Sequence, residues 1–546
     1  MFTHKRVTFF HFHVHPSLYI YKPYICTHTI KYILYIHLLH KMAISSHTIS
    51  VLLFFFVFFV IICIEANQTL SQKTLRNDSE AIVRASNDYG NIVHEIPSSV
   101  LYPSSVNDII DLVKSSNARS PPFTVAAKGR GHSVRGQAMT RGGVVVEMTS
   151  LGNSQNGSGI SVCSDQGYAD VGGDQLWVDV LRATLEQGLA PVSWTDYLYL
   201  SVGGTLSNAG ISGQAFLHGP QINNVLELDV ITGKGEFVTC SKNENPELFF
   251  GVLGGLGQFG IITRARIVLD KAPTRVKWVR LLYSDFGTLT KDQEHLISIE
   301  APNYVEGFLV TNENTTNDWR SSFSSPSNQS DVVSSFKKNN GLLYAIELVK
   351  YYDNQTAQTI DQEFEKLLKE LNFIPGFIFS TDVAFFDFLN RVGNLDNEKL
   401  PLTESHPWLN LFIPRSRISD FNSGVFTTII PEFNEPFGLF IFYPLNRNKW
   451  DDRMSAVIPD EDVFYTLALL HTSGANEYQT IDKFNGQILE FCEKAGIEVK
   501  QYLPNYQSKQ DWIKHYGSKW NIIQKRKAMF DPKMILSPGQ RIFNSV

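Results

Sequence analysis

His132 lies in a glycine-rich turn, residues 129–133, that directly follows an apolar stretch of the chain. Glycines on both sides let the backbone approach a bulky ligand closely and adopt positive φ. Consecutive amide N–H groups, together with the side chains of Lys128, Arg130 and Arg135, can then face a pyrophosphate. The turn is suited to presenting an imidazole to a flavin, although a lone histidine in such a turn is more often a structural or surface residue.

Two further glycine-rich segments favour the ligand-binding interpretation. Residues 201–213 carry small residues and hydroxyls throughout, and we expect a loop folded tightly around a ligand. They also include Val202, Leu206 and Ile211, apolar positions that a flexible linker lacks. Residues 255–260 match the G-x-G-x-x-G dinucleotide pattern. A helix is predicted before them and a strand after them, the reverse of a Rossmann turn, which argues against nicotinamide binding.

Alternating strands and helices must position these turns. The pattern up to residue 272 is typical of an α+β or mixed α/β domain. Hydrophobic periodicity and turn residues predict helices at 106–113 and 174–187, strands at 123–127 and 144–148, and a hairpin over 226–240.

The chain has 546 residues, of which 43% are apolar, enough for more than one domain around a large buried core. A composition shift near residue 272 predicts a first domain over residues 67–272 and a second over residues 273–500. Residues 501–546 are too short for a domain and must pack on one of these. The net charge of −6 and the lack of long Lys and Arg runs after the first residues argue against nucleic-acid binding, so we expect small-molecule partners.

The first residues are predicted to direct the chain into the secretory pathway. Residues 51–64 form an unbroken apolar run that is too short for a membrane helix of about 20 residues. We predict a signal peptide over residues 42–66 and an upstream extension over residues 1–41, the alternative for the latter being a second targeting segment. We expect a secreted glycoprotein without membrane association after cleavage, with the vacuole and the endoplasmic reticulum as alternative destinations. The Asn-X-Ser/Thr sites begin at Asn67, Asn77, Asn156, Asn314, Asn328 and Asn354.

Only Cys163, Cys240 and Cys492 remain after that cleavage. At most one disulfide can form, so a large core must provide the stability. No group of residues has the ligand spacing of a metal site.

Three glycine-rich segments without a Rossmann unit, one of them bearing a histidine, resemble the flavin domain of the vanillyl-alcohol oxidase and p-cresol methylhydroxylase superfamily. Within it, the chain is similar to the plant cytokinin dehydrogenases. The resemblance spans nearly all of the chain after the signal peptide, in the expected order. It is carried by GRGHS at 129–133, WTDYL at 194–198, GGTLSNAG at 203–210, residues 254–266, YVEG at 304–307, HPWLN at 406–410, YLP at 502–504 and SPGQ at 537–540.

The resemblance implies FAD as the cofactor, held by a single covalent bond from His132 to the 8α-methyl group. Such a bond would prevent loss of the flavin outside the cell. The fold would be α+β, with a non-Rossmann FAD-binding domain and a second domain that covers the isoalloxazine ring and forms the substrate pocket. Residues 501–546 would return to the flavin domain. Further contacts to FAD would come from Ala127, Gly129, Arg130, Gly131, Ser133, Gln137, Ala138, Asp196, Ser201, Ser207, Ile211, Ile261, Tyr502, Ser537 and Gln540.

Asp196 is the residue that the resemblance assigns to catalysis. Oxidising a secondary amine on an adenine ring requires the amine proton to be held while the adjacent carbon gives a hydride to flavin N5, and a carboxylate can hold that proton. From its local sequence alone, Asp196 is equally a helix-capping or turn aspartate. The substrate would also contact Leu503, with Glu306 at the pocket entrance and Trp408 at its wall, although a tryptophan next to proline is more often a core residue.

The implied activity is oxidation of N6-isoprenoid cytokinins such as isopentenyladenine and zeatin. The imine product hydrolyses to adenine and an unsaturated aldehyde, oxygen or a quinone accepts the electrons, and we expect a monomer. One alternative is a secreted FAD-dependent sugar or alcohol oxidase of the same superfamily. Such oxidases often bind the flavin through a second, cysteine link, and Cys163 lies outside residues 194–213, where we expect that link. The other alternative, a non-catalytic flavin-binding or hormone-binding protein, would gain little from a buried carboxylate at position 196.

Overall fold

The computed structural model describes six stretches of the chain, all within the unit Thr74–Val546. The predicted signal peptide and upstream extension lie outside the described residues, as do the sites at Asn67, Asn156, Asn314 and Asn328. The described stretches are residues 75–153, 159–310, 342–393, 404–433, 438–474 and 477–543.

The first sheet has four strands in the order β1-β2-β4-β3. Strands β2 and β3 both run parallel to β4, the arrangement that helical connections produce. The strands and the helix predicted for this region are confirmed. Because β3 leads directly into the turn at residues 129–133, this sheet fixes the position of His132. The elements are β1 (Leu75–Arg76), α3 (Ser79–Ala85), β2 (Ser99–Leu101), α4 (Val106–Asn117), β3 (Val125–Lys128) and β4 (Val144–Glu147).

The second sheet is antiparallel, with the path β5-β6-β10-β8-β9 and β7 paired to β10. The predicted hairpin is confirmed as β8 and β9. Helix α8 precedes the G-x-G-x-x-G pattern at residues 255–260, and strand β10 follows it. A Rossmann turn needs the reverse order, so the predicted order that argues against such a turn is present. The elements are β5 (Ile160–Cys163), β6 (Tyr168–Gly172), α5 (Trp177–Leu185), β7 (Leu189–Pro191), α6 (Val202–Leu206), α7 (Ala215–His218), β8 (Val225–Thr232), β9 (Phe237–Ser241), α8 (Pro246–Val252) and β10 (Gly260–Lys271).

Residues 201–213 are not a loop throughout, as the expected ligand-binding loop requires, because α6 (Val202–Leu206) occupies the first part. The small residues let this helix pack directly on backbone. A Cβ atom on Gly203 would lie 3.1 Å from the carbonyl oxygen of Gly173 and 3.2 Å from that of Ile262. Glycine therefore permits an approach that a larger residue would prevent.

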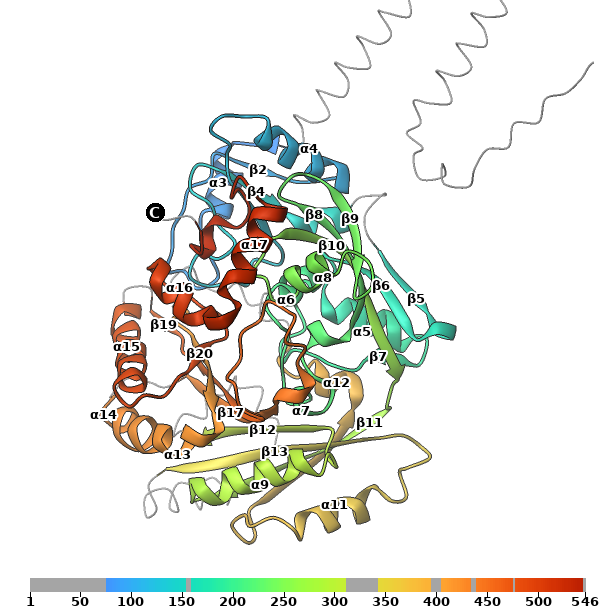
Figure 1. Cartoon of the computed structure of the whole chain (residues 1–546). Coiled ribbons are helices and arrows are strands. Elements are labelled where there is room, and N and C mark those ends of the chain that lie inside the picture. The colour runs from blue at the N-terminus through green and yellow to red at the C-terminus, as the bar shows by residue number, and fades with distance from the viewer. Residues whose placement is uncertain are drawn as a thin grey trace, which may run out of the picture. The chain divides into compact units, whose positions relative to one another are not determined.

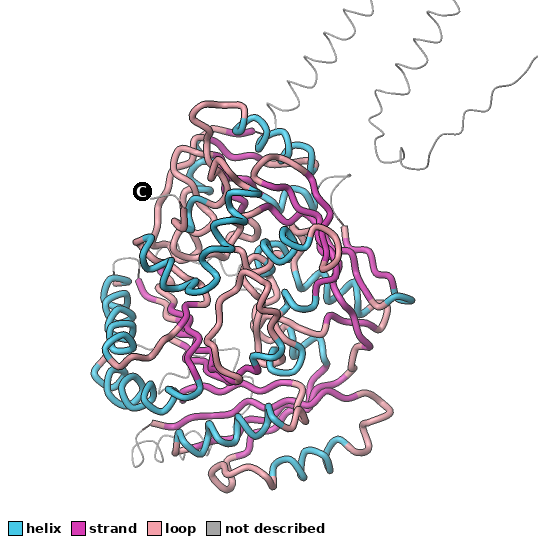
Figure 2. Tube along the Cα trace, in the orientation of Figure 1, coloured by secondary structure: helices cyan, strands magenta, loops and turns pink. Residues whose placement is uncertain are grey.

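The third sheet has eight strands in the order β14-β11-β13-β12-β17-β18-β16-β20. Helices α9 and α11 lie along one side of it, next to β13 and β11 (Figure 1), and the Cα trace shows the same separation of helices from strands (Figure 2). Its strands and the helices around them are β11 (Arg275–Tyr283), α9 (Phe286–Ser298), β12 (Tyr304–Val310), β13 (Leu343–Tyr352), α11 (Ile360–Leu368), β14 (Ile378–Ala384), α12 (Phe385–Leu389), β16 (Leu409–Pro414), α13 (Ile418–Phe421), the π-helix Asn422–Ile429, α14 (Ile430–Glu432), β17 (Leu439–Asn446), β18 (Val463–Leu470), α15 (Tyr478–Lys494) and β20 (Lys500–Gln501). A small separate sheet pairs β15 (Glu404–Ser405) with β19 (Ser473–Gly474).

The C-terminal tail returns to the first sheet through α16 (Lys509–Tyr516) and α17 (Trp520–Phe530), as Figure 1 shows. The backbone N–H of Val125 in β3 donates to the carbonyl of Ile535 (2.7 Å), and the N–H of Ser537 donates back to Val125 (2.9 Å). A fully buried ion pair between Lys527 and Asp531 (2.8 Å) stabilises the turn between α17 and this contact. These contacts place the tail against β3 of the first sheet.

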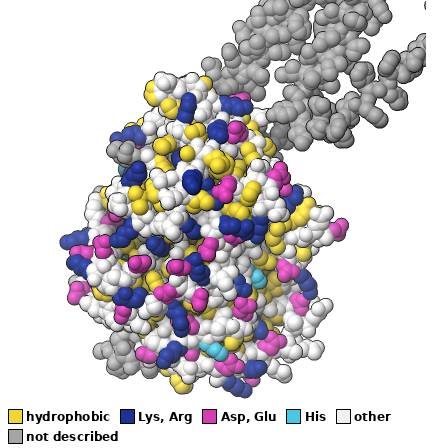
Figure 3. Space-filling view, viewed as in Figure 1, with side chains coloured by type: hydrophobic (Ala, Val, Ile, Leu, Met, Phe, Trp, Pro, Cys, Tyr) yellow, Lys and Arg dark blue, Asp and Glu magenta, His cyan; other side chains and the backbone are white. Residues whose placement is uncertain are grey.

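Charged side chains of both signs are interspersed over the face shown in Figure 3. Among the described residues, no helix is both long and apolar enough to cross a membrane. That same part of the chain contains no group of three His, Cys, Asp or Glu residues that could hold a metal ion.

Acidification should destabilise this fold through its buried histidines. Burial lowers the pKa of His406 and His471 to about 4 and that of His515 to about 3, whereas an unfolded histidine titrates near about 6.5. Between these values the unfolded chain binds more protons, so stability is greatest above about pH 6.5 and falls as the pH decreases, by about 1 kcal/mol per histidine at about pH 5.5. Urea denaturation at about pH 7 and about pH 5.5 measures this difference. An unfolding free energy that is equal or higher at the lower pH would contradict the expectation.

Candidate active site

A cavity of about 340 Å³ is enclosed by the turn after β3, helix α6, the eight-stranded sheet and the C-terminal tail. It brings together residues from widely separated parts of the sequence. Every residue for which the resemblance implies a contact with FAD or substrate lines it except Glu306. Those at its wall are Ala127, Gly129, Arg130, Gly131, His132, Ser133, Gln137, Ala138, Asp196, Ser201, Ser207, Ile211, Ile261, Trp408, Tyr502, Leu503, Ser537 and Gln540.

His132 lies in this cavity within a group of aromatic rings. Its imidazole stacks on the ring of Tyr89, with 3.7 Å between the ring centroids. The rings of Tyr197 and Trp408 lie farther away, with centroids at 4.8 and 5.9 Å. Tyr89 also stacks on His406 at 4.6 Å and lies 5.5 Å from the ring of Trp408. Burial, the largest cause, lowers the pKa of His132 to about 3, so its imidazole is neutral at physiological pH and keeps a nitrogen lone pair.

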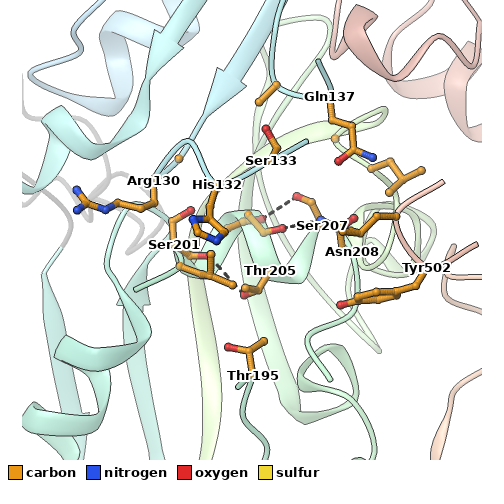
Figure 4. A pocket seen from close by; sticks show the side chains of 18 of the residues that line it. Arg130, His132, Ser133, Gln137, Thr195, Ser201, Thr205, Ser207, Asn208 and Tyr502 are labelled. Atoms are coloured by element: carbon orange, nitrogen blue, oxygen red, sulfur yellow. Dashed lines mark hydrogen bonds between the residues drawn. The ribbon is translucent and has the colours of Figure 1, made fainter. Parts of the chain in front are cut away.

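The glycines of the turn allow it to approach α6 very closely. A Cβ atom on Gly129 would lie 2.0 Å from the Oγ atom of Ser201, so even an alanine there would displace this hydroxyl. At the other end of α6, the hydroxyl of Ser207 donates to the carbonyl of Gly203 (2.7 Å). Figure 4 shows the side chains of His132, Ser201 and Ser207 around the same space. The turn and the helix therefore form one wall of the cavity.

Two of the basic side chains expected to face a pyrophosphate have other partners. Lys128 forms an ion pair with Glu147 (2.9 Å), and Arg135 donates to Asp482 (2.8 Å). Neither lines the cavity, whereas Arg130 does, with its side chain directed away from the other labelled residues (Figure 4). The expectation was wrong for Lys128 and Arg135 because neighbouring carboxylates bind them. Backbone N–H groups are then the main donors that the turn offers to an anion.

The C-terminal part of the chain forms the opposite wall. The hydroxyl of Tyr502 accepts a hydrogen bond from the backbone N–H of Gly210 (3.1 Å), and burial raises its pKa to about 12. The hydroxyl of Ser537 donates to the carbonyl of Gly257 (3.0 Å). These two hydrogen bonds join the tail to the glycine-rich segments at residues 201–213 and 255–260.

Two polar atoms at the cavity, one from each of these walls, indicate what it holds. The Oε1 atom of Gln540 and the Oδ1 atom of Asn208 are buried, and neither has a hydrogen-bond partner among the residues that the structure describes. Both residues line the cavity. Buried polar groups are nearly always hydrogen-bonded in the functional state. Their presence beside a glycine-lined wall fits a large polar ligand such as FAD.

Asp196 is held at the cavity wall by two donors. The Tyr304 hydroxyl donates to its Oδ1 atom (3.0 Å), and the Arg391 guanidinium donates to the same atom (2.6 Å). Arg391 is only 3% exposed, whereas Asp196 retains 25%. Burial raises the pKa of Tyr304 well above 10, so this hydroxyl remains a donor. Because both bonds end on Oδ1, Oδ2 is the carboxylate oxygen available to a ligand.

Glu306 does not lie at the pocket entrance. Its side chain is fully buried in β12, opposite Glu347 of β13, and it does not line the cavity. β12 is an inner strand of the eight-stranded sheet. Arg280 forms an ion pair with Glu347 (3.1 Å), so these charges lie within the sheet and not at its rim. The predicted entrance position is wrong for this reason, and the substrate contact of Glu306 stays a prediction.

The partners of Asp196 and His132 were not found from the sequence. Arg391 lies 195 residues after Asp196, and no motif connects them. A partly buried carboxylate needs a cationic partner, but the sequence contains 48 Lys and Arg residues and does not indicate which of them it is. Tyr304 lies within the YVEG segment, where Glu306 was the predicted site residue. No local pattern marks Tyr89 as the residue that stacks on the histidine.

Comparison with known proteins decides among the flavin-binding folds. A family model described as "Cytokinin dehydrogenase 1, FAD and cytokinin binding" matches residues 273–543, and one described as "FAD binding domain" matches residues 97–241. Cytokinin dehydrogenase 4 of Arabidopsis thaliana is 50% identical, with 86% of this chain and 92% of that protein covered. Cytokinin dehydrogenase 2 of the same plant is 52% identical, with 86% and 93% covered.

The chain belongs to the cytokinin dehydrogenase family. Cytokinin dehydrogenase 5 of Oryza sativa subsp. japonica is also 50% identical, with 85% of this chain and 90% of that protein covered. Family membership confirms the α+β fold with an FAD-binding and a cytokinin-binding domain.

Solved structures extend the fold to more distant proteins. A carbohydrate oxidase from Microdochium nivale superposes with a TM-score of 0.64 at 16% identity, covering 84% of this chain and 94% of its own. A chitooligosaccharide oxidase superposes with a TM-score of 0.62 at 16% identity, covering 87% and 98%. At this identity the similarity concerns the fold alone.

Removing the cation beside Asp196 should destabilise the protein. Arg391→Met leaves a partly buried carboxylate with only the Tyr304 hydroxyl as a partner, so we expect the unfolding free energy to fall by about 2 kcal/mol. Arg391→Lys keeps the charge and should lose less. Urea denaturation of the two variants and the parent measures this order. Equal stability of Arg391→Met and the parent would show that the ion pair is not needed to hold Asp196.

Proposed function

We propose that the chain oxidises N6-isoprenoid cytokinins, such as isopentenyladenine and zeatin, with FAD as the electron acceptor. The imine that forms hydrolyses to adenine and an unsaturated aldehyde. Family membership supports this activity. The single observation that carries it is the position of Asp196, whose carboxylate lines the same cavity as His132 and is oriented by Tyr304 and Arg391.

The residues of the cavity can perform the steps that this reaction needs. When bound, FAD supplies the hydride acceptor at N5 of its isoalloxazine ring. Asp196 accepts the amine proton of the substrate through its Oδ2 atom. Tyr304 and Arg391 hold Oδ1, which keeps the carboxylate in one orientation as the proton moves. Trp408 and Leu503 offer a flat apolar surface that matches a purine.

The proposed attachment of FAD is a single covalent bond to His132. Its neutral imidazole has the lone pair that bond formation requires, and stacking on Tyr89 holds the ring plane. Of the described cysteines, Cys163, Cys240 and Cys492, none lines the cavity. This supports one attachment point and not two, and it disfavours the sugar or alcohol oxidase that was the alternative.

The proposal extends to the organisation and destination of the chain. Residues 67–272 bind FAD, residues 273–500 cover it and bind the substrate, and residues 501–546 complete the flavin site. The contacts of the tail with β3 support this division. The protein is secreted after removal of residues 42–66, is a monomer, and passes its electrons to oxygen or a quinone. Glycosylation is supported by the exposure of Asn77 and Asn354 on the protein surface.

Replacement of His132 tests the covalent bond. The parent protein should keep its yellow colour after acid precipitation, whereas His132→Ala should release its flavin, because none of the described cysteines lines the cavity to take its place. His406→Ala is the matched control, since it removes a buried imidazole from the far side of Tyr89. Acid-stable flavin in His132→Ala would disprove the assignment.

Replacement of Asp196 tests the proposed reaction. Asp196→Asn keeps the shape of the side chain and a hydrogen-bond acceptor for Tyr304 and Arg391, but it cannot take up the amine proton. We expect flavin reduction by isopentenyladenine to slow by about 100- to 10,000-fold, with flavin content and substrate affinity changed much less. Stopped-flow absorbance under anaerobic conditions measures the reductive step directly. A variant whose rate stays within about threefold of the parent would leave Asp196 as a structural residue.

A further inference from the structure

Tyr443 is a buried tyrosine whose side chain points into the cavity. It lies in β17, where successive side chains alternate between the two faces of the sheet. Ile441 and Tyr443 line the cavity. Phe442 between them faces the other side, with its ring centroid 5.7 Å from that of Phe286 in α9. Only 4% of Tyr443 is exposed, so its hydroxyl has little access to bulk water.

The hydroxyl of Tyr443 makes no hydrogen bond within the described part of the chain. Other buried tyrosines of the same sheet do have partners. The Tyr304 hydroxyl donates to Asp196, and the Tyr465 hydroxyl donates to Glu294 (3.0 Å). Tyr443 lines the cavity instead, so a ligand held there can supply the acceptor for its hydroxyl.

The surroundings of Tyr443 keep this hydroxyl protonated, and Asp196 lines the same cavity. Strands β12 and β17 are antiparallel with Phe308 opposite Ile441, and continuing this register by two residues puts Glu306 opposite Tyr443. Burial, followed by the carboxylates of Glu306 and Asp196, raises the pKa of Tyr443 well above 10. At physiological pH the phenol is therefore neutral and can donate one hydrogen bond.

The chemistry of an aminopurine supplies a matching acceptor. In an N6-substituted adenine, the amine N–H lies between two ring nitrogens, N1 and N7, and both accept hydrogen bonds. Asp196 takes the amine hydrogen, so a donor near Asp196 faces one of these nitrogens. We propose that Tyr443 donates a hydrogen bond to the ring nitrogen next to the substrate amine. Together, Asp196 and Tyr443 recognise the donor and acceptor edge of an aminopurine. This inference rests on the proposed function.

Tyr443→Phe removes only the hydroxyl, so it tests the inference with little change in packing. With N6-isopentenyladenine, we expect KM to rise about tenfold while kcat and the acid-stable flavin content stay near those of the parent. The same variant is then measured with the 1-deaza and 7-deaza analogues of this substrate. If Tyr443 binds N7, the parent should show a KM about tenfold higher for the 7-deaza analogue than for N6-isopentenyladenine, and Tyr443→Phe should not raise the KM for that analogue further. If Tyr443 binds N1, the same two results are expected with the 1-deaza analogue instead.

Tyr465→Phe is the matched control, because it removes a buried hydroxyl from the other face of the same sheet. We expect its KM to equal that of the parent. An unchanged KM in Tyr443→Phe, a penalty that persists with both analogues, or the same rise in Tyr465→Phe would overturn the inference. If Tyr443→Phe does not fold, the KM values of the parent for the two analogues test the inference. Values equal to that for N6-isopentenyladenine with both analogues would overturn the inference. A parent whose flavin is not reduced by isopentenyladenine would instead remove the proposed function, and this inference with it.

Discussion

The ion pair between Asp196 and Arg391 is the contact on which the arrangement of the site depends. A carboxylate at a largely apolar wall and a guanidinium that is 3% exposed are each unfavourable alone, because burial removes their hydration. The ion pair offsets this cost of burial for both groups. The pair joins the flavin-binding part of the chain to the segment after α12, 195 residues later. It therefore ties the segment after α12 to the cavity wall at Asp196, since displacing either one would leave both charges unpaired.

The site also depends on close packing between segments of backbone. The turn at Gly129 and the helix that follows Ser201 approach so closely that a single Cβ atom would collide with a hydroxyl. The tail then closes the cavity from the other side, anchored by the buried pair of Lys527 and Asp531. The wall formed by the turn and α6 is thus built largely from glycines and small side chains.

The sequence predicted the parts of the site that depend on local structure. The glycine-flanked histidine lines the cavity, the hairpin at β8 and β9 forms, and the helix before the second glycine pattern excludes a Rossmann turn. It could not predict partners that are distant in the chain. Lys128 and Arg135 were expected at a phosphate, but each finds a nearer carboxylate in the folded chain. Glu306 was expected at the entrance, yet the position of β12 inside a sheet is a property of the topology and not of the YVEG segment.

The central claim is that this cavity brings an oxidisable N6-side chain to a flavin beside Asp196. Anaerobic titration of the purified, flavin-loaded protein with N6-isopentenyladenine tests it most directly, because the flavin absorbance reports electron transfer without any assumption about the final acceptor. The account predicts bleaching of the flavin band that is complete at one equivalent of substrate, with adenine as the purine product after hydrolysis. A band that persists with excess isopentenyladenine, or one that is bleached by a sugar instead, would contradict it.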